Sequence, residues 1–179
     1  MLTARETKRN KSTFFDMSMM FDVLDGERHI GTIVFDRKTY SATLALDGEN
    51  FTVRRISERH DERFYEALIR VVTGGSKPSA NPWALRDAAG DTLALGDIEG
   101  ATLVVSRGEE RFWLRQIKRA YHLYRAGSNQ SLGWVGQQKI FTNSFSMDLP
   151  GEYDPAFQVF LLTLMLSLSM KTADNGGGT

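Results

Sequence analysis

The residues of this 179-residue chain that could do acid-base or metal chemistry are its three histidines. His60 stands in the run His60-Asp61-Glu62, where a carboxylate could orient an imidazole for general base catalysis. That run lies between Arg54 and Arg63 in a charge-rich segment, which favours a solvated turn. His29 and His122 are distant in the sequence, and no two histidines have the spacing of a metal-ligand pair. We therefore predict no catalytic residue and no metal site.

No sequence signature of a nucleotide, serine-hydrolase or zinc-protease site is present. The segment Thr73-Gly74-Gly75-Ser76-Lys77 ends like a phosphate-binding loop, but it lacks the upstream glycine and leads into Pro78 instead of a helix. The chain has no cysteine, which excludes disulfides, cysteine-ligated zinc and a thiol nucleophile. We predict that the protein uses no cofactor.

Positive charge is clustered at a few positions. The candidate ligand-binding residues are Arg54, Arg55, Arg59, Lys118 and Arg119. Adjacent residues of a strand point to opposite faces, so one residue of each doublet would line a polar surface or the mouth of a barrel, with simple solvation as the alternative. Over the whole chain 22 Lys and Arg balance 22 Asp and Glu. This balance predicts no nucleic-acid partner and leaves only a local basic patch open.

The elements that must position these residues are mostly strands. Turn signals recur at short intervals, at Asp25-Gly26, Asp47-Gly48, Gly74-Gly75, Ala89-Gly90-Asp91, Glu99-Gly100, Arg107-Gly108 and Gly127-Ser128-Asn129. Alternating apolar residues between such turns are typical of hairpins in a sandwich or barrel. We predict about twelve strands, beginning near residues 18, 28, 41, 50, 63, 82, 92, 101, 111, 120, 131 and 140. Residues 63–73 also fit a helical repeat, so the fifth strand could instead be a short helix.

Two local predictions concern side chains within these strands. In residues 51–56 the apolar alternation slips by one residue, and a bulge at Arg54-Arg55 would return Ile56 to the core. Trp83, Trp113 and Trp134 also lie in predicted strands. Their large apolar surface favours packing in the core over stacking on a ligand.

The last long segment, residues 155–170, carries no charge. Asp154 can cap a helix that begins at Pro155, while Lys171 and Gly176 supply a cation and a stop at its other end. A helix that is apolar on every side must be surrounded by protein or by lipid. As a helix this segment rises about 24 Å, less than the ~30 Å of a bilayer core, so we predict a helix buried in protein.

The predicted fold is therefore mainly β, within the α+β class: an antiparallel barrel of about twelve strands that encloses the apolar C-terminal helix. A barrel of this size has an interior too wide for its own side chains, which a central helix would fill. Residues 14–171 form the predicted domain. Residues 1–13 are polar and mildly basic and are expected to be a flexible tail without an export signal. The Gly-rich residues 172–179 are expected to be a second flexible tail.

This order of elements resembles the Tubby C-terminal-like superfamily, which includes tubby domains, phospholipid scramblases and LURP-one-related proteins. The resemblance rests on the paired strand unit Trp83 to Asp87 and Thr92 to Leu95, on a late strand ending at Pro150, and on the apolar helix Phe157 to Met170. It implies a barrel wrapped around a C-terminal helix. Because members of the superfamily engage membrane phospholipids, it also implies an anionic headgroup as a ligand for the clustered cations.

We predict a non-catalytic binding domain that is cytoplasmic and peripheral to a membrane, with an anionic phospholipid as its partner. Two alternatives remain open at this stage. The first is an enzyme whose active site is assembled from dispersed residues, and the second is a protein-protein scaffold.

Overall fold

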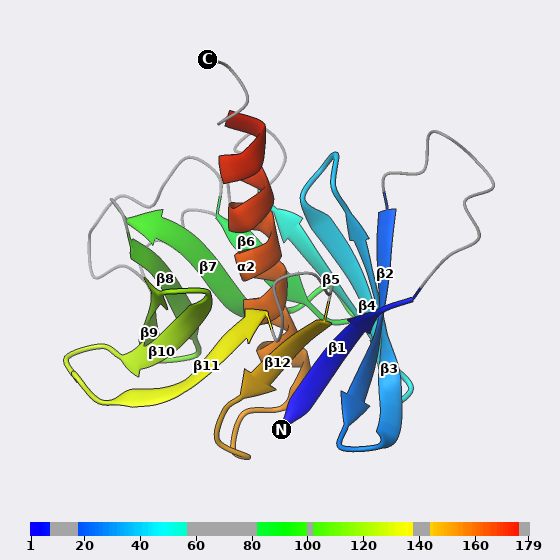
Figure 1. Cartoon of the computed structure of the whole chain (residues 1–179), viewed down its shortest axis with the longest axis horizontal. Coiled ribbons are helices and arrows are strands. Elements are labelled where there is room, and N and C mark those ends of the chain that lie inside the picture. Colours follow the sequence, from blue (N-terminus) through cyan, green and yellow to red (C-terminus); the bar gives the residue numbers. More distant parts are fainter. Residues whose placement is uncertain (8–17, 57–81, 100–101, 138–143, 176–179) are drawn as a thin grey trace.

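Twelve antiparallel strands close into a barrel around one C-terminal helix (Figure 1), which confirms the predicted fold class. The computed structural model describes residues 1–7, 18–56, 82–99, 102–137 and 144–175. The elements are β1 (Leu2–Glu6), β2 (Ser18–Asp25), β3 (Arg28–Asp36), β4 (Ser41–Leu46), β5 (Glu49–Arg55), β6 (Trp83–Arg86), β7 (Thr92–Glu99), β8 (Thr102–Arg107), β9 (Glu110–Ile117), β10 (Ala120–Arg125), β11 (Ser131–Gln137), β12 (Ser144–Asp148) and α2 (Pro155–Asn175). Each strand pairs with its neighbours in sequence, and β1 pairs with β12.

The hairpins follow the turn chemistry of the sequence. At the β4–β5 turn, Asp47 and Gly48 have φ angles of 46° and 87°. Positive φ at both central residues is the pattern of a type I′ turn, whose twist matches that of the flanking strands. Alternation then sends Ala42, Leu44 and Leu46 into the barrel, where each is at most 4% exposed.

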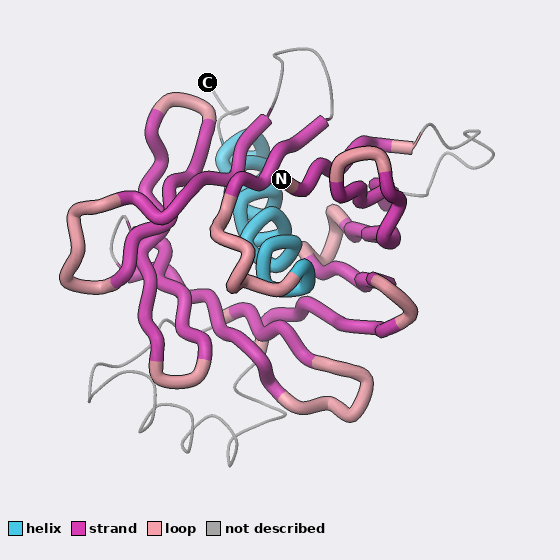
Figure 2. The backbone as a smooth tube through the Cα atoms, turned by 90° about the horizontal axis from the view of Figure 1, so that it is seen from below, coloured by secondary structure: helices cyan, strands magenta, loops and turns pink. Residues whose placement is uncertain are grey.

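The helix α2 fills the barrel interior (Figure 2). Every residue from Ala156 to Ser167 is at most 7% exposed, which confirms a helix buried in protein. Its buried hydroxyls bond back to the helix: Thr163 Oγ1 donates to the Val159 carbonyl at 2.9 Å, and Ser167 Oγ to the Thr163 carbonyl at 2.8 Å. These two buried hydroxyls are therefore satisfied within the helix.

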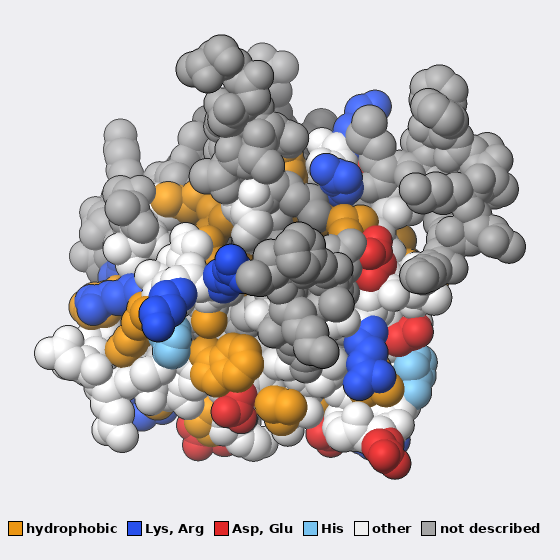
Figure 3. All heavy atoms as spheres, in the orientation of Figure 1, with side chains coloured by type: hydrophobic (Ala, Val, Ile, Leu, Met, Phe, Trp, Pro, Cys, Tyr) orange, Lys and Arg blue, Asp and Glu red, His pale blue; other side chains and the backbone are white. Residues whose placement is uncertain are grey.

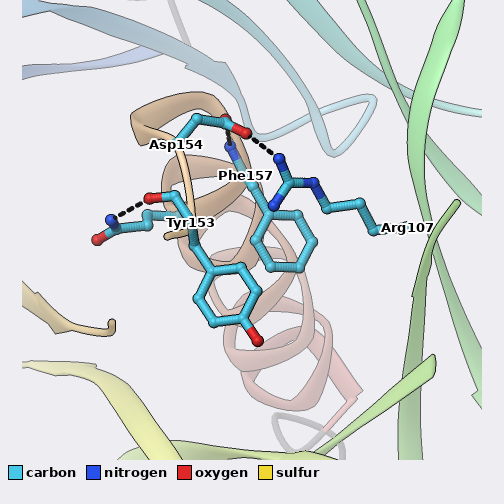
Figure 4. Close-up of polar contacts among 5 residues, drawn as sticks. Arg107, Tyr153, Asp154 and Phe157 are labelled. Carbon is cyan, nitrogen blue, oxygen red and sulfur yellow. Dashed lines mark hydrogen bonds and ion pairs between the residues drawn. The ribbon is translucent and has the colours of Figure 1, made fainter. Parts of the chain in front are cut away.

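The first turn of α2 is capped as predicted (Figure 4). Asp154 Oδ1 accepts a hydrogen bond from the Phe157 amide at 2.8 Å. The other oxygen of Asp154 accepts from Arg107 at the end of β8, and the Arg107 guanidinium lies 5.1 Å from the centre of the Phe157 ring. These contacts tie the start of the helix to the barrel wall.

The flexible-tail predictions at both termini need correction in the part that the structure describes, while residues 8–13 and 176–179 lie outside the described residues. Residues 2–6 form β1, which pairs with β2 and β12, and Ala4 is fully buried. Its side chains alternate over too few residues to stand out in the sequence, yet without this strand the barrel would not close. At the other terminus α2 continues beyond Met170 to Asn175, directly before the predicted stop at Gly176, because nothing before that glycine breaks a helix.

The bulge predicted at Arg54-Arg55 is wrong. The register between β5 and β6 is regular, with Arg54 opposite Ala84 and Arg55 opposite Trp83. Ile56 is instead buried in a small separate cluster with Ala84 and Leu95. Val53 and Leu85 point into the barrel, so Ala84 and its cluster lie on the outer face. The apolar pattern of residues 51–56 slips by one residue because side chains are buried on both faces of the sheet at this point.

The remaining predictions concern the three tryptophans and one strand. Trp83 is in the core at 2% exposure, as predicted. Trp113 and Trp134 are not, because each neighbours a strictly buried residue, Phe112 and Val135, and therefore points to the outer face. The strand predicted near residue 63 lies outside the described residues.

We expect Gly96→Val to destabilise the barrel. A Cβ at Gly96 on β7 would lie 2.6 Å from Leu164 Cδ1 of the helix. The substitution should lower the free energy of unfolding by about 1–3 kcal/mol in chemical denaturation. Gly151→Ala, where an added Cβ meets nothing within 4 Å, is the control. The cost should shrink when Leu164→Ala is combined with Gly96→Val, and additive costs would contradict this contact.

Candidate anion-binding site

The predicted basic residues that the structure describes lie at one end of the barrel. The helix begins near the β4–β5 turn, where Asp47 and Pro155 line a common pocket. The end of β5 and the β9–β10 turn are therefore at the opposite end, toward which α2 runs (Figure 1). Arg54 and Arg55 close β5, and Lys118 and Arg119 form the turn after β9. We refer to this end of the barrel, which contains the C-terminal part of α2, as the open-helix end.

The structure does not gather these four cations into one contact cluster. Strands β6, β7 and β8 separate β5 from β9 around the barrel. Arg54, Lys118 and Arg119 are exposed, whereas Arg55 is partly buried. Arg59, the fifth candidate, lies outside the described residues. Arg55 thus differs from the others in its environment.

The side chain of Arg55 points into the barrel because of strand parity. Phe51 and Val53 on the same strand are buried at 8% and 0% exposure, so Arg55 continues the inward row. Its register partner is Trp83, and the Arg55 guanidinium lies 4.2 Å from the centre of the Trp83 ring. This is a close cation-π contact at the inner rim of the barrel.

Both members of this pair have a buried N–H group without a hydrogen-bond acceptor. Arg55 Nε and Trp83 Nε1 are shielded from solvent, and neither has a partner in the part of the chain that the structure describes. Burial lowers the pKa of Arg55, although the Tyr40 side chain acts in the opposite direction. A buried donor without an acceptor is costly, and such groups are candidates for ligand contacts.

The β9–β10 turn presents a different surface at the same end. Lys118 has a φ of 57°, and its carbonyl accepts a hydrogen bond from Gln116 Nε2 at 3.2 Å. Beside the two cations of the turn, Ile117 is 45% exposed. The turn thus combines a projecting apolar residue with two positive charges.

Sequence reasoning placed Arg55 among the candidates but missed Trp83 as its partner. The only available signal was the even spacing from Phe51 to Arg55, which puts a cation in an apolar row. The expected bulge obscured that signal. The partner could not be found without the β5–β6 register, which connects residues 28 positions apart.

The opposite end of the barrel holds a pocket of about 440 Å³ beside the first turn of α2. Its lining combines carboxylates with apolar side chains, namely Leu46, Asp47, Glu49, Phe51, Leu93, Asp154, Pro155 and Ala156. Asp154 is already engaged by the helix and by Arg107, and Asp47 lies 3.6 Å from Arg28. Two of the three carboxylates of the pocket therefore already make structural contacts.

The histidines that the structure describes make only loose polar contacts. His29 pairs loosely with Asp22 at 3.5 Å, and His122 Nδ1 lies 3.4 Å from Ser131 Oγ. The run His60-Asp61-Glu62 lies outside the described residues. Among the described residues no group of three or more His, Asp or Glu side chains could hold a metal ion.

Comparison of the chain with protein-family models, with curated proteins and with solved structures gave no match. The resemblance to the Tubby C-terminal-like superfamily therefore stays a prediction. Within the described residues, no helix is long and apolar enough to cross a membrane.

Tyr153 should make the protein sensitive to alkali. It is 2% exposed, and burial raises its pKa above the ordinary 10.0, aided by Glu110 and Glu152 and opposed by Arg125. Its stabilising contribution is complete below pH 10 and is lost as the pH rises through the folded-state pKa. Denaturation from pH 9 to 11 should show a smaller loss of stability in Tyr153→Phe than in the native chain, and parallel losses would refute this role.

Proposed function

We propose that this protein is a non-catalytic binding domain that holds the phosphate of an anionic phospholipid headgroup at the open-helix end of its barrel. The observation that carries the proposal is the Arg55–Trp83 pair. A partly desolvated guanidinium and an indole N–H lie side by side there, each with a buried N–H that lacks an acceptor in the described structure. The protein would act by recruitment to a membrane surface.

A phosphate fits this pair for chemical reasons. Guanidinium forms two parallel hydrogen bonds to phosphate oxygens, and these charge-assisted bonds are about twice as strong as neutral ones. The lowered pKa of Arg55 shows that burial disfavours its charge, and a bound anion would relieve that cost. Trp83 would add a neutral donor from the same rim.

The exposed residues at this end support a lipid as the source of the phosphate. Arg54, Lys118 and Arg119 are exposed cations, and each contributes about 1 kcal/mol near an anionic membrane. Ile117 projects beside two of them and offers apolar area to the interface. The resemblance to a superfamily that engages phospholipids favours the same assignment.

The decisive experiment is flotation with phosphatidylcholine vesicles, with and without phosphatidylserine or a phosphoinositide. We expect the native chain to float only with the anionic vesicles. Arg55→Gln should reduce binding by roughly 10- to 150-fold, the value of one charged hydrogen-bonding group. Arg54→Gln is the matched control from the outer face of the same strand, and it should weaken binding only about fivefold at low salt.

Two further measurements separate the possible results. Calorimetry with inorganic phosphate and with a soluble inositol phosphate tests whether the anion is bound outside a membrane. Trp83→Phe keeps an aromatic ring under Arg55 but removes its N–H, and should reduce binding with little change in melting temperature. Absence of any anion-dependent binding, or equal losses in the Arg55 and Arg54 variants, would overturn the proposal.

A further inference from the structure

The outer face of β9, β10 and β11 carries three aromatic side chains in adjacent strands. Tyr124 lies directly opposite Trp113, and Trp134 lies opposite His122. All three rings are only partly buried. Since His122 stands two residues before Tyr124, the four rings lie on one side of the sheet. We call these residues, together with Arg115, the aromatic face.

Arg115 connects the rings of this face. It lies opposite His122, and its guanidinium is 5.2 Å from the centre of the Trp113 ring and 5.3 Å from that of Tyr124. Arg115 is itself exposed. The face therefore presents π surfaces together with a positive charge that aromatic neighbours hold in place.

Charge is unevenly distributed in a chain whose net charge is zero. Residues 111–137 contain no Asp or Glu, and their cations are Arg111, Arg115, Lys118, Arg119 and Arg125. Glu110 pairs with Arg125 at 2.7 Å and compensates that charge. On the flanking strand β12, Asp148 lies opposite Trp134, and Asp97 is farther away on β7, opposite Val104. The centre of the aromatic face is thus positive, with acids only toward its edges.

Figure 3 shows this side of the molecule, with hydrophobic side chains next to Lys and Arg side chains and a histidine over β10 and β11. The charge balance of the whole chain predicts no nucleic-acid partner but leaves a local basic patch open. We propose that the aromatic face is such a patch and forms a second binding surface, for single-stranded nucleic acid. Bases would stack on Trp113, Tyr124 and Trp134, while Arg115 and the cations of the β9–β10 turn would contact phosphates.

The dimensions of the sheet suit this ligand. Neighbouring strands are about 4.8 Å apart, so the rings from β9 to β11 span about 10 Å. Aromatic side chains spread over adjacent strands in this way can stack two or three bases. A duplex would offer no free base faces to these rings, and charge contacts alone would bind it without them.

A membrane fits this surface less well than it fits the open-helix end. The rings of the aromatic face stand in the middle of strands and are partly packed on the sheet. Side chains that enter an interface from a soluble domain project from it, as Ile117 does at its turn. The aromatic face therefore suits stacked bases, whereas the open-helix end suits a membrane surface.

The test is fluorescence anisotropy with labelled oligo(U) and oligo(dT) at low and physiological salt. We expect salt-sensitive binding that Tyr124→Ala and Trp134→Ala each weaken by roughly 5- to 150-fold. Arg115→Gln should reduce the slope of log affinity against log salt by about 0.7, the value of one phosphate contact. Trp134→Leu keeps apolar volume without a stacking face, and should show the same loss if the alanine variant unfolds.

Matched controls come from outside the face. Lys38→Gln removes an exposed cation from the β3–β4 turn, and Leu93→Ala truncates an apolar side chain that is 39% exposed. Neither should change the affinity more than twofold. Three results would overturn the proposal: no binding at low salt, losses no larger in the face variants than in the controls, or face variants that lose vesicle binding but keep oligonucleotide binding.

Discussion

The structure depends on one constraint, which is that a helix apolar on all sides cannot face water. Residues Ala156 to Ser167 would each leave apolar surface exposed on any two-layer packing. A closed barrel covers every side at once, and burial of each large side chain contributes about 1.5–3 kcal/mol. The strand number follows from this need, because a barrel of fewer strands has an interior that side chains alone fill.

That constraint also decides where ligands can bind. The interior is occupied by α2 over most of its length, so the described structure contains no central ligand chamber of the kind seen in barrels without a helix. A ligand would therefore have to bind at the rims or on the outer face. Arg55 and Trp83 belong to the rim, where the inward row of a strand passes from core to solvent. The aromatic face belongs to the outside of the wall.

The sequence was sufficient for the fold because two independent patterns agreed. Alternation between turns indicated the strands, and the capped, uncharged segment after Asp154 indicated the helix that they enclose. It was insufficient for β1, whose pairing depends on strands far along the chain. The candidate site was also harder to predict from the sequence, because it too depends on pairing between distant strands. Arg55 and Trp113 are assigned to the inner and outer faces by register and by burial of their neighbours, and a single sequence shows neither directly.

The pairing of Leu2 with Met147 has a consequence for how the chain acquires its structure. Closing a loop of that length costs about 4 kcal/mol of chain entropy beyond a constant term, and nothing repays it until the last strand arrives. The helix comes later still, so all twelve strands are synthesised before the element that fills their centre exists. During that interval their inward rows are exposed, and one edge of β1 stays unpaired until β12 arrives. Long-range strand pairing of this kind slows folding and leaves apolar surface open to aggregation until the barrel closes.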